Sequence, residues 1–434
     1  MARPAVLSSA SPAVGAAIDV DAVVRGVLFL AVFLSAWISY HPFRSLAEPP
    51  PTLAEGGDPA NQIGFSLLFI SLAVWTYFHE PRRLVLLVRP ALIATVAWCA
   101  VSVVASWDPS LAGRRLAFAL VLMSITAMVL LLPKNVRHFA DLLAAAVLIV
   151  LLVSYLGVLL VPQLAVHQAT DFLEPEHAGE WRGVFAHKNQ AGATMVRCIF
   201  IGLFVARVRS LALGATIVVL AGIFLACAES KTAIGVLPLV FGLAAMVRRT
   251  PPAIGAAIVV AVLAIFLLCS VGTVVFEPIH QLVAAVMPDA TFTGRTDIWQ
   301  LGVHAVAQRP LTGYGFSSFW GTEQVVYGLG GDSNWANTAT DAHNAYLNLA
   351  VTIGIPGMLL TVRWVVVMPV LDSYSPPRDG LEWAMQTLFL RICLFGMLGS
   401  CFESSIFQQV GEVWFFFMTS AFGLRYLAKT KAAA

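Results

Sequence analysis

Charged residues are scarce in this chain of 434 residues, because Asp, Glu, Lys and Arg together make up only 12% of it. A soluble globular domain carries roughly a quarter charged residues, so about half of the expected charge is missing. Hydrophobic residues make up 59%, and the mean hydropathy is +0.82. The few charges cluster and leave apolar runs that are long enough to cross a hydrocarbon core of about 30 Å as helices. The composition therefore predicts an all-α, polytopic membrane protein and excludes an ordinary soluble domain.

Neither the net charge nor the cysteine spacing points to a nucleic-acid partner, a disulfide framework or a metal cluster. The formal net charge is only +2, so nothing indicates a nucleic-acid partner. The six cysteines show no paired loop spacing, which predicts neither disulfides nor a cysteine metal cluster. They lie in or at the edges of apolar runs: Cys99, Cys198, Cys227, Cys269, Cys393 and Cys401.

The apolar runs predict about 12 transmembrane helices. The expected spans are 23–40, 63–78, 84–106, 116–132, 139–162, 189–206, 210–228, 231–247, 252–276, 343–371, 384–402 and 412–428. The third can begin later than drawn, because Arg89-Pro90 lies near its start. With the N-terminus inside, the cytoplasmic loops collect more Lys and Arg than the others, which places both termini in the cytoplasm.

These spans divide the chain into five segments. Residues 1–22 are expected as a disordered cytoplasmic tail, 23–276 as nine helices with short loops, 277–342 as a large periplasmic loop, 343–428 as three more helices, and 429–434 as a second tail. Within the large loop, 295–310 predicts an amphipathic helix that lies on the membrane surface or against the bundle. Thr296 is its expected cap, Asp297 falls in its first turn, and Arg309-Pro310 ends it.

Three short polar stretches carry most of the external chemistry. The first, residues 180–190, packs Arg182, His187, Lys188, Asn189 and Gln190 at the mouth of a span. Such a cluster is costly without a partner, and an anionic headgroup would supply one. The alternative is that these side chains snorkel and mark a helix end.

The second stretch is Thr293-Gly294-Arg295-Thr296-Asp297. A helix N-terminus that is preceded by Gly and carries Arg can hold phosphate or pyrophosphate. The aspartate competes for the same helix dipole, so a capped surface helix with a contact between Arg295 and Asp297 is an equal alternative.

The third stretch is Asp341-Ala342-His343-Asn344, which opens the tenth predicted span. A histidine at the interface can accept a proton from a sugar hydroxyl. Asp341 is only two residues away, which is poor helical spacing for a contact, and a lone histidine is often structural. Gly354 and Pro356-Gly357 are expected to kink the helix about three turns in.

The third stretch resembles the signature of the O-antigen ligase and polysaccharide polymerase family, bacterial membrane proteins that use undecaprenyl-pyrophosphate-linked saccharides. The ligase branch has His, then Asn, Ser or Gln, nine residues, Gly, two residues, and Gly, Thr or Tyr. Here His343, Asn344, Gly354 and Gly357 fit that spacing throughout. The run 181–189 and the Thr-Gly-Arg at 293–295 resemble the two arginine-bearing external segments of the family. The run 181–189 is closer to exopolysaccharide polymerases of the succinoglycan type.

The resemblance implies a role for each matching residue. His343 would be the general base on the acceptor hydroxyl, and Arg182 and Arg295 would hold the donor pyrophosphate. Substrate-binding residues would be His187, Lys188, Asn189 and Asn344, with no metal and no cofactor. The partners implied are a lipid-linked oligosaccharide, a saccharide acceptor and membrane lipid, with a flippase and a chain-length regulator as further candidates.

The function implied is polymerisation of lipid-linked repeat units into exopolysaccharide or O-antigen, at the periplasmic face of the bacterial inner membrane. One alternative is an O-antigen ligase that transfers lipid-linked glycan to the lipid A core. A transporter or a structural subunit of an export complex is the alternative of a different class. Against a transporter, the mid-span Arg197, Arg363 and Arg391 are expected to lack a carboxylate partner near the centre of any span.

Overall fold

The computed structural model describes residues 19–38, 42–47, 58–172, 174–286, 292, 294–322, 324–328, 336, 339–408 and 411–430. Residues 1–18 of the predicted N-terminal tail and 431–434 of the predicted C-terminal tail lie outside the described residues. The remainder of the N-terminal tail is already helical, since the first helix begins at Val20 and the Asp19 carboxylate caps it by accepting the Ala22 N–H at 3.1 Å.

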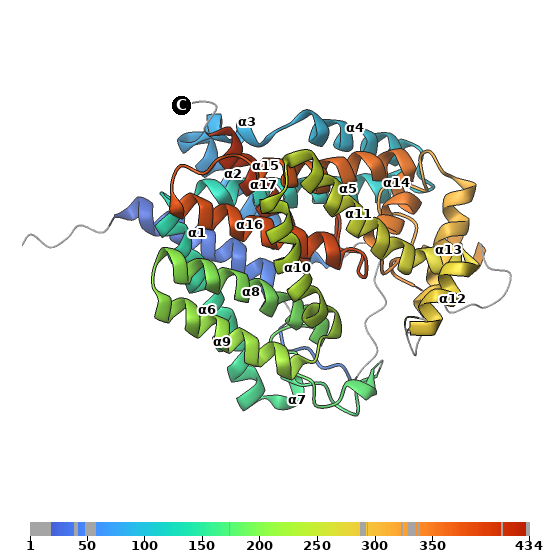
Figure 1. The fold of residues 1–434 in the computed structure, drawn as a ribbon, viewed down its shortest axis with the longest axis horizontal. Coiled ribbons are helices and arrows are strands. Elements are labelled where there is room, and N and C mark those ends of the chain that lie inside the picture. Colours follow the sequence, from blue (N-terminus) through green and yellow to red (C-terminus); the bar gives the residue numbers. More distant parts are fainter. Residues whose placement is uncertain are drawn as a thin grey trace, which may run out of the picture.

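The described part of the chain is a bundle of helices (Figure 1), which confirms the predicted all-α class. The helices are α1 (Val20–Trp37), α2 (Pro59–His79), α3 (Pro81–Leu87), α4 (Pro90–Val104), α5 (Pro109–Met128), α6 (Val136–Leu160), α7 (Pro162–Ala165), α8 (Lys188–Val208), α9 (Leu211–Ala228), α10 (Lys231–Arg249), α11 (Pro252–Cys269), α12 (Glu277–Val286), α13 (Arg295–Gln308), α14 (Ala345–Val362), α15 (Met368–Asp372), α16 (Gly380–Gly399) and α17 (Glu412–Lys429). The six cysteines are all free, as predicted.

Ten helices in the described residues are long and apolar enough to cross a membrane, and a bent pair makes an eleventh. That pair is α3 and α4, which meet at 77° where Arg89 precedes Pro90. A residue before proline is pushed out of the helical region, so the predicted third span is broken there. The last predicted span is α17, which has 18 residues but carries Glu412, Arg425 and Lys429. It is therefore not one of the ten helices counted above.

The predicted span 252–276 is too long. Helix α11 ends at Cys269, and the Ser270 hydroxyl donates back to the Phe266 carbonyl at 2.8 Å. A short 3-10 turn (Val271–Val274) follows, and then α12, a second helix of the external loop that the sequence reading missed. Leu282 and Val286 of α12 are exposed, which suits a helix at a membrane surface.

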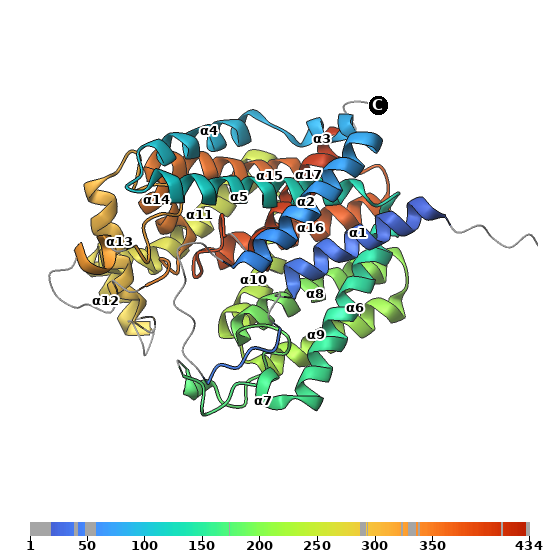
Figure 2. The ribbon, with the colours of Figure 1, turned by 180° about the vertical axis from the view of Figure 1, so that it is seen from behind.

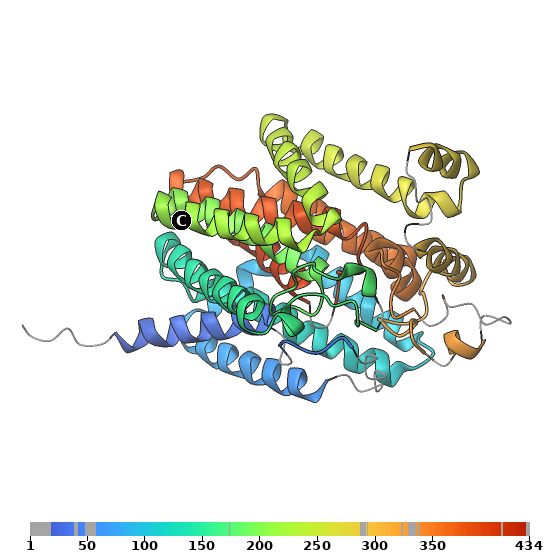
Figure 3. The same cartoon turned by 90° about the horizontal axis from the view of Figure 1, so that it is seen from below.

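The helices run between two ends of the bundle. The described chain begins and ends at one of them, whereas α7, α12 and α13 lie at the opposite one (Figures 1 and 2). Viewed from below, the segment after α7 lies nearest the viewer, in front of the helices of the bundle (Figure 3). The end with α7, α12 and α13 is the one that the charge pattern assigns to the periplasm.

A buried ion pair lies inside the bundle. Arg197 of α8 is 1% exposed, and its Nη2 lies 3.3 Å from the Glu412 carboxylate at the start of α17. Gln190 donates to the same carboxylate at 2.8 Å, and the guanidinium lies over the Phe416 ring. The expectation that no carboxylate lies near the centre of a span left out a partner of this kind. A carboxylate at the end of one span reaches Arg197 from a neighbouring helix.

Helix α14 is broken at Gly354, as predicted. Its φ of 73° is in the region that only glycine adopts freely. The carbonyls left unpaired around the break accept hydrogen bonds from elsewhere: Tyr314 N donates to Val351, Gly315 N to Thr352, and Trp98 Nε1 to Ile353. The Ile355 N–H, also freed by the break, donates to the Pro310 carbonyl. The segment after α13 is thereby fixed to the first half of α14. This fixes the start of α14 relative to α13.

Candidate active site

His343 stands directly before α14, at the end of the bundle that carries α13. Its φ is 45°, so it is not helical, and its N–H donates to the Asp341 carboxylate at 2.7 Å. The ring Nδ1 also lies 3.8 Å from that carboxylate. The helical spacing argument against a contact between Asp341 and His343 therefore does not apply, because neither residue is in the helix.

Glu403, in the loop after α16, joins the histidine to an arginine. His343 Nδ1 lies 3.4 Å from Glu403 Oε2, and Arg295 Nη2 lies 3.1 Å from Glu403 Oε1. Arg295 Nη1 also donates to the Phe402 carbonyl at 2.5 Å. Two of the three residues with predicted catalytic roles, His343 and Arg295, thus meet on one carboxylate.

The start of α13 differs from its predicted form. The cap is Gly294, with a φ of 84° and no side-chain cap bond, so Thr296 does not cap the helix. Arg295 is instead the first helical residue, and Thr293 lies outside the described residues. Asp297 falls in the first turn and Arg309 follows the last, as predicted. The apolar face, with Ile298 and Trp299, is buried against the bundle.

The interactions among His343, Glu403 and Arg295 shift the pKa values of His343 and Glu403. The hydrogen bond to Glu403 raises the pKa of His343, with burial and Arg295 opposing and Asp341 assisting. Burial alone would raise the pKa of Glu403, but the bonds and charges of His343 and Arg295 lower it overall. Glu403 is therefore ionised and can hold a proton on Nδ1. His343 Nε2 has no hydrogen-bond partner among the described residues, and a ring with Nδ1–H has a lone pair there to accept a proton.

Asn344 is fully buried and its side chain is engaged. Its amide oxygen accepts the Leu347 N–H at 3.0 Å and so caps α14, while its Nδ2 donates to the Cys401 carbonyl at 2.8 Å. The structure thus places Asn344 behind His343, where it ties the start of α14 to the loop that carries Glu403.

Arg182 lies in a second group, in the segment between α7 and α8. Its guanidinium is 1% exposed and donates to the Phe185 carbonyl at 3.0 Å and the Arg44 carbonyl at 2.6 Å. Its Nε has no hydrogen-bond partner among the described residues. Burial lowers the pKa of Arg182, with the charge of Asp171 opposing. A buried guanidinium is thus held by neutral oxygens.

The residues after Arg182 have partners within the chain. His187 Nδ1 accepts the Asn189 N–H at 3.1 Å and caps α8, and its Nε2 lies 2.6 Å from Glu174. The hydrogen bond to His187 lowers the pKa of Glu174 to about 2. Lys188 pairs with Glu180 at 2.6 Å, and the Asn189 amide oxygen accepts the Ser230 hydroxyl at 3.1 Å. Carboxylates of the chain thus pair with His187 and Lys188, whereas Arg182 contacts only neutral oxygens among the described residues.

The two groups lie at the same end of the bundle but remain separate. In the described part of the chain no hydrogen bond or ion pair joins Arg182 to Arg295 or His343. The groups also come from different elements, since α13, α14 and the loop after α16 build one, and the segment between α7 and α8 builds the other.

The sequence reading missed Glu403. One signal was present: the polar run Glu403-Ser404-Ser405 follows the predicted span 384–402, on the face that also carries His343. Glu403 is the first carboxylate after that span, so topology alone places it beside the other external polar stretches.

Two comparisons with known proteins bear on this arrangement. The family model described as O-antigen ligase matches residues 216–362, a segment that contains Arg295 and His343. The exopolysaccharide production protein ExoQ of Rhizobium meliloti (strain 1021) is 26% identical over 205 residues. That alignment covers 42% of this chain and 45% of the relative, so the chain spans about half the length of the curated relative it matches.

Proposed function

We propose that this chain, whose residues 216–362 match the family model described as O-antigen ligase, polymerises undecaprenyl-pyrophosphate-linked oligosaccharide repeat units at the periplasmic face of the inner membrane. The observation that carries the proposal is the group of His343, Glu403 and Arg295 at the external end of the bundle. It combines a base, a carboxylate that orients the base, and a cation, within reach of lipid headgroups.

The transfer step follows from these roles. The acceptor hydroxyl oxygen bonds to the anomeric carbon of the donor as the bond from that carbon to the pyrophosphate oxygen breaks. His343 Nε2 takes the hydroxyl proton, and Glu403 stabilises the imidazolium that forms. Arg295 stabilises the charge that develops on the leaving pyrophosphate. The proton on His343 then passes to solvent, which restores the base.

Arg182 completes the proposed donor site. Its guanidinium contacts carbonyl oxygens, and no carboxylate pairs with it among the described residues. A buried cation without an ionic partner is costly, and an anionic donor would supply one. Two guanidiniums can provide the stabilisation that a divalent ion gives to pyrophosphate elsewhere, so the proposed transfer step uses no metal ion at the reacting atoms.

Polymerase and ligase differ in the acceptor, which is another lipid-linked glycan for the first and the lipid A core for the second. The relative named for exopolysaccharide production favours the polymerase.

The test is complementation of a deletion strain with single-residue variants. We expect His343→Ala to abolish polymer while the protein is still inserted and expressed. Arg295→Ala and Arg182→Ala should do nearly the same, and Arg→Lys should restore activity only in part, because lysine loses the bidentate geometry. His304→Ala is the matched control, since His304 is exposed on α13 and its one side-chain hydrogen bond among the described residues is to Gln308.

The saccharides of the deletion strain separate the alternatives. Accumulated single repeat units identify a polymerase, and unmodified lipid A core beside intact lipid-linked polymer identifies a ligase. Full-length polymer in His343→Ala cells would refute the proposed mechanism. Unchanged glycans with impaired solute uptake would point to a transporter.

A further inference from the structure

Three histidines meet in the segment between α7 and α8, away from the proposed base. The rings of His167, His177 and His187 pack edge to face, with centroids 5.1 to 5.8 Å apart. Around them stand three carboxylates, from Asp171, Glu174 and Glu180. Neither His177 nor Glu174 has a role in the transfer step proposed above.

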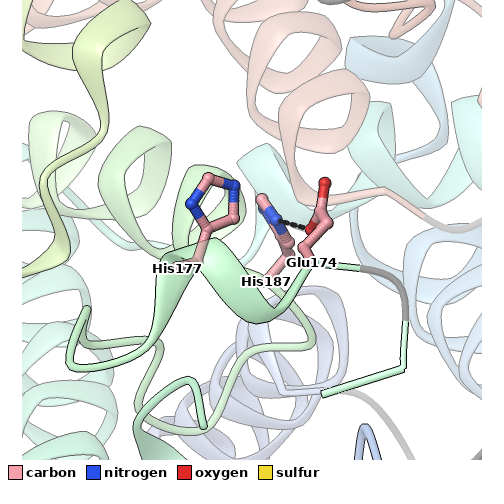
Figure 4. A group of neighbouring side chains, drawn as sticks. All are labelled: Glu174, His177 and His187. Carbon is pink, nitrogen blue, oxygen red and sulfur yellow. Dashed lines mark hydrogen bonds and ion pairs between the residues drawn. The ribbon is translucent and has the colours of Figure 1, made fainter. Parts of the chain in front are cut away.

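One ligand atom from each of Glu174, His177 and His187 lies within 4.8 Å of the others. Figure 4 shows the Glu174 carboxylate on one side of the His187 ring and a ring nitrogen of His177 facing both. All three side chains are partly exposed, so an ion can enter from the external side. We propose that these three residues bind a zinc ion, independently of the transfer reaction.

His177 already has the outer contact that metal-bound histidines use. Its Nδ1 lies 3.1 Å from Glu180 Oε2, so the nitrogen that faces His187 and Glu174 is Nε2. A histidine that ligates a metal usually donates its other N–H to a carboxylate, which fixes the tautomer and strengthens the ligand. Glu180 also pairs with Lys188 at 2.6 Å, and this pair offsets the lysine charge near the ion.

His187 requires a rearrangement before it can ligate. In the structure its Nε2 shares a proton with Glu174 at 2.6 Å, while its Nδ1 accepts the Asn189 N–H. Zinc would replace the shared proton, and the ring would then carry its proton on Nδ1 and lose one cap bond to α8. His167 is not a ligand, since its Nδ1 lies 2.9 Å from Asp171 and its Nε2 accepts the Lys188 N–H at 3.3 Å.

The donor set selects the metal. Two imidazole nitrogens and one carboxylate oxygen suit zinc, whereas calcium and magnesium prefer oxygen ligands alone. Zinc–ligand bonds of about 2.0 to 2.2 Å require side-chain rotations that bring His177 closer and open the pair of Glu174 and His187. The ion would tie residues 174–177 to the start of α8 and so fix the segment that carries Arg182.

The test is zinc binding to the purified full-length protein in detergent, prepared without a polyhistidine tag and stripped with a chelator. We expect one zinc ion per chain by elemental analysis and calorimetry. Cobalt should substitute and give the strong visible absorption of a four-coordinate site with nitrogen and oxygen ligands. His177→Ala and Glu174→Gln should each abolish stoichiometric binding, and Glu180→Gln should weaken it by about 10- to 100-fold.

Two variants serve as controls: Glu176→Gln, which changes an exposed carboxylate beside the site, and His304→Ala, which removes an exposed histidine elsewhere. Both should bind zinc as the parent protein does. Glu174→Gln is nearly isosteric, so it decides the matter if His177→Ala does not fold. Absence of stoichiometric zinc in the parent protein, or equal binding in Glu174→Gln, would overturn the proposal.

Discussion

Replacing Glu412 with glutamine should destabilise the protein strongly, because it leaves the Arg197 charge uncompensated inside the bundle. The side chains of Arg197 and Glu412 are 1% and 5% exposed, and Nη2 lies 3.3 Å from Oε1. At an effective dielectric constant of 20, two unit charges at that distance attract by about 5 kcal/mol. Breaking a buried pair by removing one partner typically costs about 3–5 kcal/mol. We therefore expect the unfolding equilibrium to shift by a factor of roughly 160 to 4,800.

The measurement is an unfolding titration in mixed micelles, read by tryptophan fluorescence. Asp141→Asn is the matched control: Asp141 pairs with Arg209, but the two side chains are 45% and 43% exposed, so its loss should cost about 0–1 kcal/mol. Arg197→Met combined with Glu412→Leu removes both charges and should recover most of the lost stability. If Glu412→Gln costs no more than Asp141→Asn, the reasoning about the buried pair is wrong.

Three further predictions concern the site and its placement. Glu403→Gln should move the acidic limb of the pH–activity profile to lower pH, because Glu403 raises the pKa of His343 and the base works only when neutral; an unmoved limb would exclude the contact from catalysis. Gly354→Ala should cost at least about 1 kcal/mol of unfolding free energy in the same titration, because alanine is strained at a φ of 73° and the new Cβ would lie 1.9 Å from the Leu311 carbonyl oxygen. Gly235→Ala is the control and should be harmless, since its Cβ would have no atom within 4 Å. In a cysteine-free background, a cysteine at the exposed Glu176 should react with an impermeant reagent from the periplasm and one at Pro377 should not, and the opposite pattern would reverse the orientation.

The spans and the break in α14 could be predicted because their causes are local. A hydrophobic run is visible within about 20 residues, and Gly354 followed by Pro356 indicates a break wherever the helix lies. The end of α11 was predicted too late in the sequence, because the local hydrophobic pattern was again the only signal. Val271 to Phe276 remains apolar, so composition gives no signal that the chain turns at Ser270 and starts a second surface helix.

Partners across the fold could not be predicted in this way. Glu403 reaches His343 from 60 residues away, and Glu412 reaches Arg197 from 215 residues away. Each contact depends on how two helix ends are placed side by side, and hydrophobicity alone does not specify that placement. The motif spacing identified His343 but not the carboxylate that sets its protonation.

The break at Gly354 also has a mechanical consequence. The first half of α14 is hydrogen-bonded to the segment after α13 and to α4, and Ile355, the first residue of the second half, donates its N–H to the Pro310 carbonyl of the same segment. Stress from a bilayer that thins or thickens acts on the whole length of a membrane helix. Here hydrogen bonds on both sides of Gly354 hold the first half of α14 to α4 and to the segment after α13, so we expect such stress to act on the rest of the helix before it displaces His343.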